Sequence, residues 1–272
     1  MMNKVYPFLL SVPHGGTAIP PGLGDRILLT GEEIRYYSDP ASLELYDFRE
    51  RVQGYLEASV SRVLVDLNRP PYYLPPRHTD GVVKTVTPDG IEIWKDRCVP
   101  DLPCIHRLLM THYFPYHDRI NILLDTLPVE LAIDCHTMTP VGAPRNHDAG
   151  KKRPLVCIGN NGNSSGEPRP HALLTCPPGW ARALARTFRE IFPGPGDVLL
   201  NEPYPGGFIP NAHYWHKGVP WIQLELNRSL YEVPSGTHPG PAAVDGERVR
   251  NLHDTIWNVL STFWDGLQQG PV

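Results

Sequence analysis

The chain has 272 residues, of which 41% are apolar and 20% charged, and its formal net charge is -4. This composition supplies enough apolar side chains for a core and is typical of folded rather than disordered chains. The negative charge and the lack of a Lys/Arg cluster argue against a nucleic-acid or anionic-membrane partner. An α/β chain of this length commonly folds as one unit, so we expect a single domain over residues 1–272.

Short runs rich in Val, Ile and Leu alternate along the chain with helical patterns. In chain order, the runs and the three-to-four-residue periodicity predict a strand at 5–12, a helix at 41–58, a strand at 60–67, a helix at 101–126, strands at 129–135 and 153–159, a helix at 177–192, strands at 196–200 and 219–226, and a helix at 243–267. Segment 70–100 breaks this pattern, and "TVTPDGIEIW" within it is expected to form a hairpin or an active-site loop. The alternation predicts a three-layer α/β/α fold with a mostly parallel mixed sheet.

Two features bear on the cellular compartment. The first run, "VYPFLLSVP", is too short to cross a bilayer and has no basic leader or small-residue cleavage site. The five cysteines form no CxxC pair, which is typical of reduced thiols. We therefore expect a cytoplasmic protein.

Polar residues follow four of the predicted strands. In open α/β sheets, ligands bind outside the carboxyl ends of the strands. The candidate functional residues are therefore His14 in "SVPHGG", Asp66, Asn68 and Arg69 in "VDLNR", Asp134 and His136 in "IDCHTM", and Gln223, Glu225, Asn227 and Arg228 in "IQLELNR".

The "IDCHTM" stretch suggests a metal ligand. Side chains alternate along a strand, so Asp134 and His136 share one side and Cys135 faces away, which excludes Cys135 as the nucleophile of His136. An imidazole with a carboxylate on its other nitrogen is a common zinc ligand, although a satisfied core histidine is the alternative. His14 precedes Gly15, where the missing side chain would allow a sharp turn or close approach of a ligand.

Other residues could complete such a site. A catalytic zinc needs a third ligand, and Asp39 in "YYSDPASLELYDF" either serves as that ligand or caps the following helix. Glu225 either faces water or, in a sheet covered on both sides, acts as general base to a metal-bound water. Asn68 and Arg69 suit a substrate carboxylate, and a surface ion pair is the alternative for Arg69.

A serine hydrolase is an alternative interpretation, because "GNSSG" at 162–166 matches the G-x-S-x-G motif. That motif requires a helix directly after the serine. Prolines at 168 and 170 prevent one, so Ser164 is expected to lie in a loop.

The ordered set of motifs resembles the N-formylglutamate amidohydrolase family and, more distantly, the zinc carboxypeptidases and aspartoacylase. The resemblance rests on "SVPHGG", "SDPASLELYDF", "SRVLVDLNRPP", "TVTPDG", "FPYHDRI", "AIDCHTM", "PYPGGFIPNAHYW" and "IQLELNRSLY". It implies a phosphorylase/hydrolase-like fold and the cleavage of N-formyl-L-glutamate to L-glutamate and formate, a step of histidine breakdown. It also implies one zinc ion held by His14, Asp39 and His136, catalysis by Glu225 and Arg62, and substrate contacts from Asn68, Arg69, Gly207 and Asn211.

Three departures from the family pattern concern the ligand set and the substrate. Thr17 stands where zinc carboxypeptidases have an acidic ligand, so the acid must come from elsewhere. Gly15 and the Pro210-Asn211 pair stand where deformylases commonly have Ser and Arg.

Two alternative functions remain open. One is a peptidase or esterase acting on another carboxylate-bearing substrate, and the other is a non-catalytic protein that binds metal or carboxylates.

Overall fold

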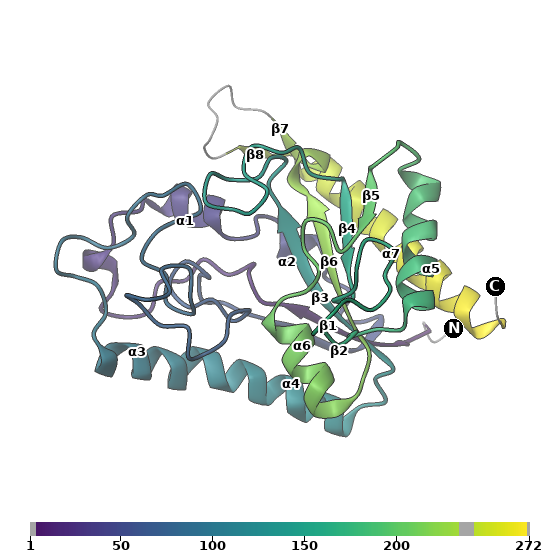
Figure 1. Ribbon diagram of the computed structural model, residues 1–272, viewed down its shortest axis with the longest axis horizontal. Helices are drawn as coiled ribbons and strands as arrows, with labels where there is room; N and C mark the ends of the chain where they lie inside the picture. Colours follow the sequence, from purple (N-terminus) through teal and green to yellow (C-terminus); the bar gives the residue numbers. More distant parts are fainter. Residues whose placement is uncertain (1–3, 234–241, 271–272) are drawn as a thin grey trace.

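The computed structural model describes residues 4–233 and 242–270. Its centre is a six-stranded sheet in the order β2-β1-β3-β6-β4-β5 (Figure 1). The strands are β1 (Tyr6–Val12), β2 (Val52–Glu57), β3 (Leu131–Met138), β4 (Val156–Gly159), β5 (Val198–Leu200) and β6 (Trp221–Asn227). Strands β2, β1, β3 and β6 are parallel to one another, whereas β4 is antiparallel to β6 and parallel to β5. The predicted mostly parallel mixed sheet is confirmed.

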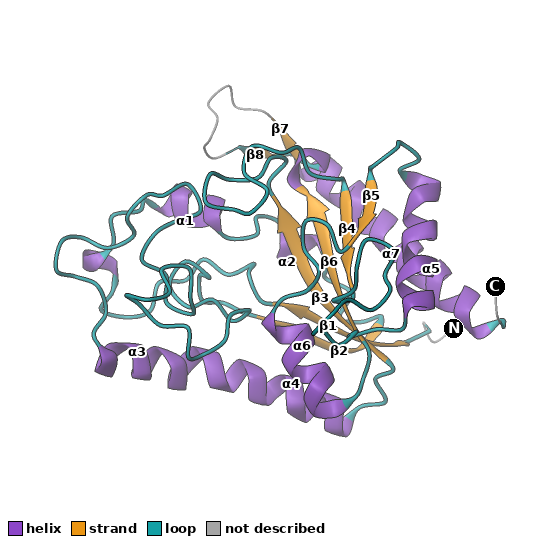
Figure 2. Cartoon of the chain, in the orientation of Figure 1, coloured by secondary structure: helices purple, strands orange, loops and turns teal. Residues whose placement is uncertain are grey.

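Helices cover both faces of this sheet (Figure 2). On one face lie α5 (Pro178–Ile191), α7 (Gly246–Gln268) and the short α2 (Ser42–Leu45), and on the other lie α4 (Phe114–Thr126) and α6 (Phe208–Lys217). Helix α3 (Leu102–Leu108) continues through a π turn, η2 (Leu109–Tyr113), into α4. The remaining elements are α1 (Gly31–Tyr37), the 3-10 turns η1 (Gly24–Arg26) and η3 (Arg228–Leu230), and the strand pair β7 (Glu232–Val233) and β8 (Ala243–Val244).

Side-chain alternation along the central strands separates the core from the polar residues. In β3, Ile133 and Cys135 pack into the core beneath α5 and α7, as the alternation predicts. Asp134 and His136 face the other side, where Asp134 accepts a hydrogen bond from Ser11 of β1. Because all of β3 is buried, these polar groups need partners within the protein.

Two predicted elements are wrong. The predicted helix 41–58 is instead α2, a turn and strand β2, although its apolar residues Leu45, Phe48 and Val52 do share one core. The helix-like spacing of these three residues therefore arises because a short helix, a turn and a strand each bury one of them in the same core. The predicted strand 60–67 forms only an isolated bridge at Val60 and then a turn. Its apolar residues are buried beneath α4, which explains the continuous hydrophobicity without a strand.

The other elements were predicted correctly in type and approximate position, except that α1, α6 and the short strand pair β7 and β8 were not predicted. In segment 70–100, the "TVTPDGIEIW" stretch has one internal bridge, between Val86 and Glu92, and a second bridge from Trp94 to Ile27, and otherwise forms a loop. That loop reaches the cavity described below. Within the part of the chain that the structure describes, no helix is both long and apolar enough to cross a bilayer.

Candidate active site

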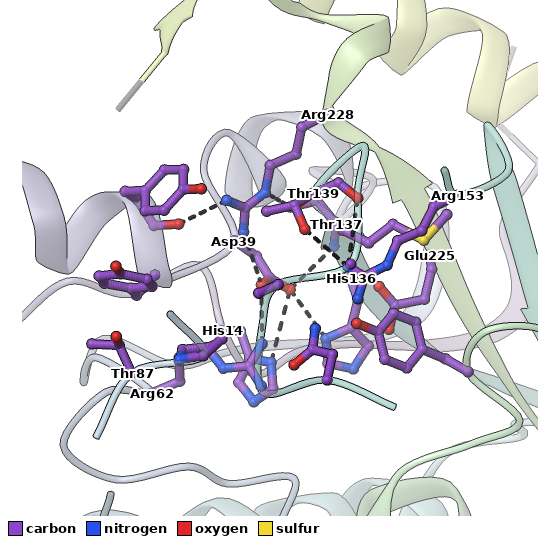
Figure 3. A pocket seen from close by; sticks show the side chains of 18 of the residues that line it. His14, Asp39, Arg62, Thr87, His136, Thr137, Thr139, Arg153, Glu225 and Arg228 are labelled. Carbon is purple, nitrogen blue, oxygen red and sulfur yellow. Dashed lines mark hydrogen bonds and ion pairs between the residues drawn. The ribbon is translucent and has the colours of Figure 1, made fainter. Parts of the chain in front are cut away.

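A cavity of about 780 Å³ opens at the carboxyl ends of the parallel strands. His14 follows β1, His136 lies near the end of β3, and Glu225 lies near the end of β6. All three line the cavity (Figure 3). Because β1, β3 and β6 are adjacent and parallel, their polar ends meet at one edge of the sheet, as predicted.

His14, Asp39 and His136 lie close together in this cavity. One ligand atom from each of the three lies within 4.8 Å of the other two, and all three side chains are buried. The main chain contributes to this arrangement, since Asp39 N donates to His14 O at 2.9 Å. The structure therefore brings the three predicted ligands together.

Each imidazole is oriented by an aspartate on its outer nitrogen. His14 Nε2 lies 2.8 Å from Asp66 Oδ1, and His136 Nε2 lies 2.8 Å from Asp134 Oδ2. A carboxylate accepts hydrogen bonds only, so both Nε2 atoms are the protonated donors. Both Nδ1 atoms then face Asp39 Oδ2, at 3.8 Å from His14 and 3.1 Å from His136.

The inner nitrogen of His14 tests whether a metal ion fits this site. His14 Nδ1 is buried and has no hydrogen-bond partner among the described residues. Burying an unpaired polar atom is costly, and an imidazole lone pair facing a carboxylate is suited to a cation. Two such nitrogens and a carboxylate oxygen form a donor set typical of catalytic zinc sites, so the residues fit the ion.

The Asp39 side chain faces the two histidines and does not cap a helix. Its Oδ2 accepts from Thr137 N at 3.1 Å and its Oδ1 accepts from Arg62 Nη1 at 3.3 Å. Near the start of α2, whose N-cap residue is Ala41, Asp39 contributes its carbonyl oxygen, which accepts from Ser42 N and Ser42 Oγ. Burial raises the pKa of Asp39, but the hydrogen bond from His136 and the charge of Arg62 hold the pKa well below its usual range. The carboxylate is therefore ionised.

The two histidines titrate differently. Burial and the nearby Arg62 charge lower the pKa of His14 to about 4, despite Asp66, so His14 is neutral. Burial also lowers the pKa of His136, but Asp134 and Asp39 together raise it well above the usual range. A proton on His136 Nδ1 faces Asp39, and a metal ion binding here would replace that proton.

Glu225 lies directly beside His136, since the two are register partners in the β3 and β6 pair. Gln223 Nε2 donates to Glu225 Oε1 at 2.8 Å. Burial raises the pKa of Glu225 to about 7, an effect that the His136 charge partly offsets. A carboxylate that titrates near neutrality next to a metal site is suited to taking up and returning a proton.

Asn68 is engaged entirely within the protein. Its Nδ2 donates to Asp134 Oδ2 at 2.8 Å, and its Oδ1 accepts from Ile209 N at 2.7 Å. A Cβ on Gly207 would lie 2.4 Å from the Asn68 side chain, so this glycine allows the contact. Asn68 and Gly207 line the cavity, where the Asn68 amide supports the Asp134 and His136 pair.

Of the remaining predicted residues, Arg62 and Arg69 line the cavity, whereas Asn211 and Ser164 lie outside it. Arg62 lines the cavity and bridges two carboxylates, with Nη2 donating to Asp66 Oδ2 at 3.1 Å. Arg69 also lines the cavity. Asn211 lies instead on a separate hollow beside α6, where it accepts from Asn161 and donates to Gly207 O. Ser164 lies in an exposed turn outside the cavity wall.

Sequence reasoning did not find several supporting residues. The role of Asp66 in holding His14 was not predicted, although its place in "VDLNR" was noted. Lys84 and Asp80, which contact each other in the cavity wall, were not predicted, because nothing in the loop sequence marks them. At Gly15, the missing side chain allows close approach of the Leu43 side chain, since a Cβ there would lie 2.6 Å from it.

Comparisons with known proteins match the chain to one family model and to solved structures of similar fold. A family model described as N-formylglutamate amidohydrolase matches residues 6–232. The N-formylglutamate amidohydrolase from Ralstonia eutropha JMP134 has a similar structure, with a TM-score of 0.75 and 20% identity over 99% of this chain and 96% of that chain. The gene product Atu2144 from Agrobacterium tumefaciens has a TM-score of 0.63 and 18% identity over 94% and 90% of the two chains. No curated protein matches the chain.

Proposed function

Because the chain belongs to the N-formylglutamate amidohydrolase family, we propose that it hydrolyses N-formyl-L-glutamate to L-glutamate and formate with one zinc ion. The observation that carries this proposal is the meeting of His14, Asp39 and His136 beside Glu225 at one edge of the sheet. A protein that merely binds carboxylates has no use for a buried carboxyl group that titrates near neutrality.

The metal would be held by His14 Nδ1, His136 Nδ1 and an Asp39 oxygen. A zinc ion with three protein ligands acidifies water and polarises a carbonyl group. Asp66 and Asp134 hold the imidazoles in the tautomer that leaves both Nδ1 atoms free for the ion.

Glu225 carries the proton through the reaction. Its carboxylate accepts a proton from the attacking water as the new carbon–oxygen bond forms, and returns it to the nitrogen as the carbon–nitrogen bond breaks. With a pKa of about 7, it can do both at neutral pH. Arg62 would stabilise negative charge on the carbonyl oxygen, a role that its charge and its position on the cavity wall support.

The substrate carries carboxylates, and Arg69 offers a cation on the cavity wall. We assign the reaction to histidine breakdown in the cytoplasm. The five cysteines, all described and all unpaired, support a reducing compartment.

A panel of substrates tests this function. Formate release from N-formyl-L-glutamate should exceed turnover of N-acetyl and N-succinyl amino acids and of dipeptides by at least about tenfold in kcat/KM, because specificity is a difference in transition-state binding. Preferred cleavage of a dipeptide would identify a peptidase instead. No turnover of any compound by folded, metal-loaded protein would favour a non-catalytic binding protein.

A further inference from the structure

A second charged group of residues lies on the cavity wall next to the metal site. Arg69 Nη2 donates to Asp80 Oδ2 at 2.9 Å, and Lys84 Nζ donates to Asp80 Oδ1. All three residues line the cavity. One carboxylate therefore joins two cations at a place that a substrate can reach.

Neither cation needs the Asp80 carboxylate to stay in place. The guanidinium of Arg69 also donates from Nε to the main-chain oxygen of Asp80 at 3.1 Å and from Nη1 to Asn68 O at 3.3 Å. Lys84 Nζ also lies 2.9 Å from the buried Asp66 Oδ2. Without the side chain of Asp80, Arg69 and Lys84 would both keep these other contacts. Each would then have an N–H group free to donate to another acceptor.

Asp80 differs from its two partners in exposure. Its side chain is 57% exposed, whereas that of Lys84 is 5% exposed. Its main chain is fixed by a tight loop, because Gly81 N donates to His78 O and Val82 N donates to Tyr73 O. Because the Asp80 side chain is itself largely exposed, its carboxylate can turn toward solvent without disturbing the loop.

We propose that Arg69 and Lys84 together bind one carboxylate of the substrate, and that the Asp80 carboxylate occupies this pair until the substrate displaces it. The proposal rests on the proposed function, because it assigns the place of a substrate carboxylate in the same cavity. Lys84 extends the predicted contact of Arg69 to two cations, and charge-assisted hydrogen bonds from two donors hold a carboxylate in a defined orientation.

The position of the Arg69 and Lys84 pair suits a small substrate. Asp66 receives Lys84 Nζ on one oxygen and His14 Nε2 on the other. The pair is thus separated from a metal ligand by a single carboxylate group. A molecule as short as N-formylglutamate can therefore place its amide at the metal site while a carboxylate contacts the pair.

The test compares Asp80→Ala with Asp89→Ala in the metal-loaded enzyme. Asp89 also lines the cavity, where it accepts from Tyr37 Oη at 2.9 Å, so its removal changes the cavity charge equally. Calorimetry with L-glutamate should show about tenfold tighter binding to Asp80→Ala, with Asp89→Ala within about twofold of wild type. The KM for N-formyl-L-glutamate should fall in parallel while kcat stays unchanged. In the Asp80→Ala background, Arg69→Gln should reverse the gain.

Unchanged or weaker glutamate binding by Asp80→Ala would overturn the proposal and give Asp80 a purely structural role. Because binding is measured apart from turnover, the two proposals can fail separately. Tighter binding without any hydrolysis would retain the carboxylate site and reject the reaction, and hydrolysis without tighter binding would do the reverse. Asp80→Asn, which keeps the side-chain shape, should show a smaller gain in the same direction.

Discussion

Glu225 shows how one buried side chain acquires a chemical role from its neighbours. Its register partner His136 lies between two aspartates, and Gln223 donates to one of its carboxylate oxygens. Burial disfavours the ionised carboxyl group, whereas the His136 charge favours it, and the balance places the pKa at about 7. The side chain can therefore change its protonation state at neutral pH without a large cost.

Replacing Glu225 with Gln should lower kcat by about 10²- to 10⁴-fold, because the amide cannot accept the proton of the attacking water. Metal content should stay at the wild-type level, since the three ligands are untouched. Formate release and metal analysis on the same preparation check this. Glu130→Gln, at an exposed position, is the matched control. A Glu225→Gln rate near that of wild type would assign the proton transfer to another group.

The site residues that could be predicted from sequence are those whose role is indicated by residues close to them in the sequence. The alternation in "IDCHTM" was enough to place Asp134 and His136 on one face and Cys135 on the other. The contact of Asp66 with His14 joins residues 52 positions apart, and no local pattern encodes it. The engagement of the Asn68 amide by Ile209 N likewise depends on the packing of α6, which was not predicted.

At the scale of elements, helix α4 and the π turn before it hold the loop that supports the proposed metal site. Tyr113 Oη donates to Arg69 O at 2.8 Å, and His117 Nε2 donates to Leu67 O at 3.0 Å. Tyr113 and His117 are four residues apart, so they lie on one helix face. The two carbonyl oxygens that they contact belong to the residues on either side of Asn68. His117 Nδ1 then accepts from His213 Nε2 of α6 at 2.9 Å. Two helices therefore fix the same loop.

This histidine pair makes stability depend on pH. Burial lowers the pKa of His117 to about 4 and that of His213 to about 3, so both are neutral in the folded protein. The unfolded chain takes up protons below about pH 6.5, and the free energy of unfolding then falls by up to about 1.4 kcal/mol per pH unit for each histidine. The contribution is fully present above pH 6.5 and is lost as the pH falls toward the folded values.

The variant His213→Gln tests this dependence, because Gln can still donate to His117 Nδ1 but does not titrate. Urea unfolding at pH 7.5, 5.5 and 4.5 should show a shallower loss of stability in the variant than in wild type. Other titrating groups are shared and cancel in the comparison. An identical pH slope in the two proteins would show that His213 is not a buried neutral group.

The fold could be predicted where one element supplies the whole pattern. Long amphipathic helices such as α5 and α7 have a clear helical period, and fully buried strands such as β3 and β6 contain short runs rich in apolar residues. Segment 41–58 failed because Leu45, Phe48 and Val52 pack into one core from a helix, a turn and a strand in succession. Helix propensity and spacing cannot distinguish that arrangement from one continuous helix.

For the molecule as a whole, the topology of the sheet creates the site. His14, Asp39, His136 and Glu225 come from segments spread over more than 200 residues of the sequence. The parallel strands β1, β3 and β6 bring three of them to one edge, and the segment between α1 and α2 adds Asp39. Asp39 is ionised and His14 is neutral, and the Nδ1 atom of His14 has no hydrogen-bond partner in the described part of the chain. All three features favour a bound cation.

The most direct test is the zinc content of purified, folded and active protein, measured by mass spectrometry. We expect about one zinc ion per chain in wild type and in His106→Ala, whose side chain is exposed on α3. We expect loss of the metal and of formate release in His136→Ala. Wild-type protein that hydrolyses N-formyl-L-glutamate at full rate without a stoichiometric divalent metal would contradict the account.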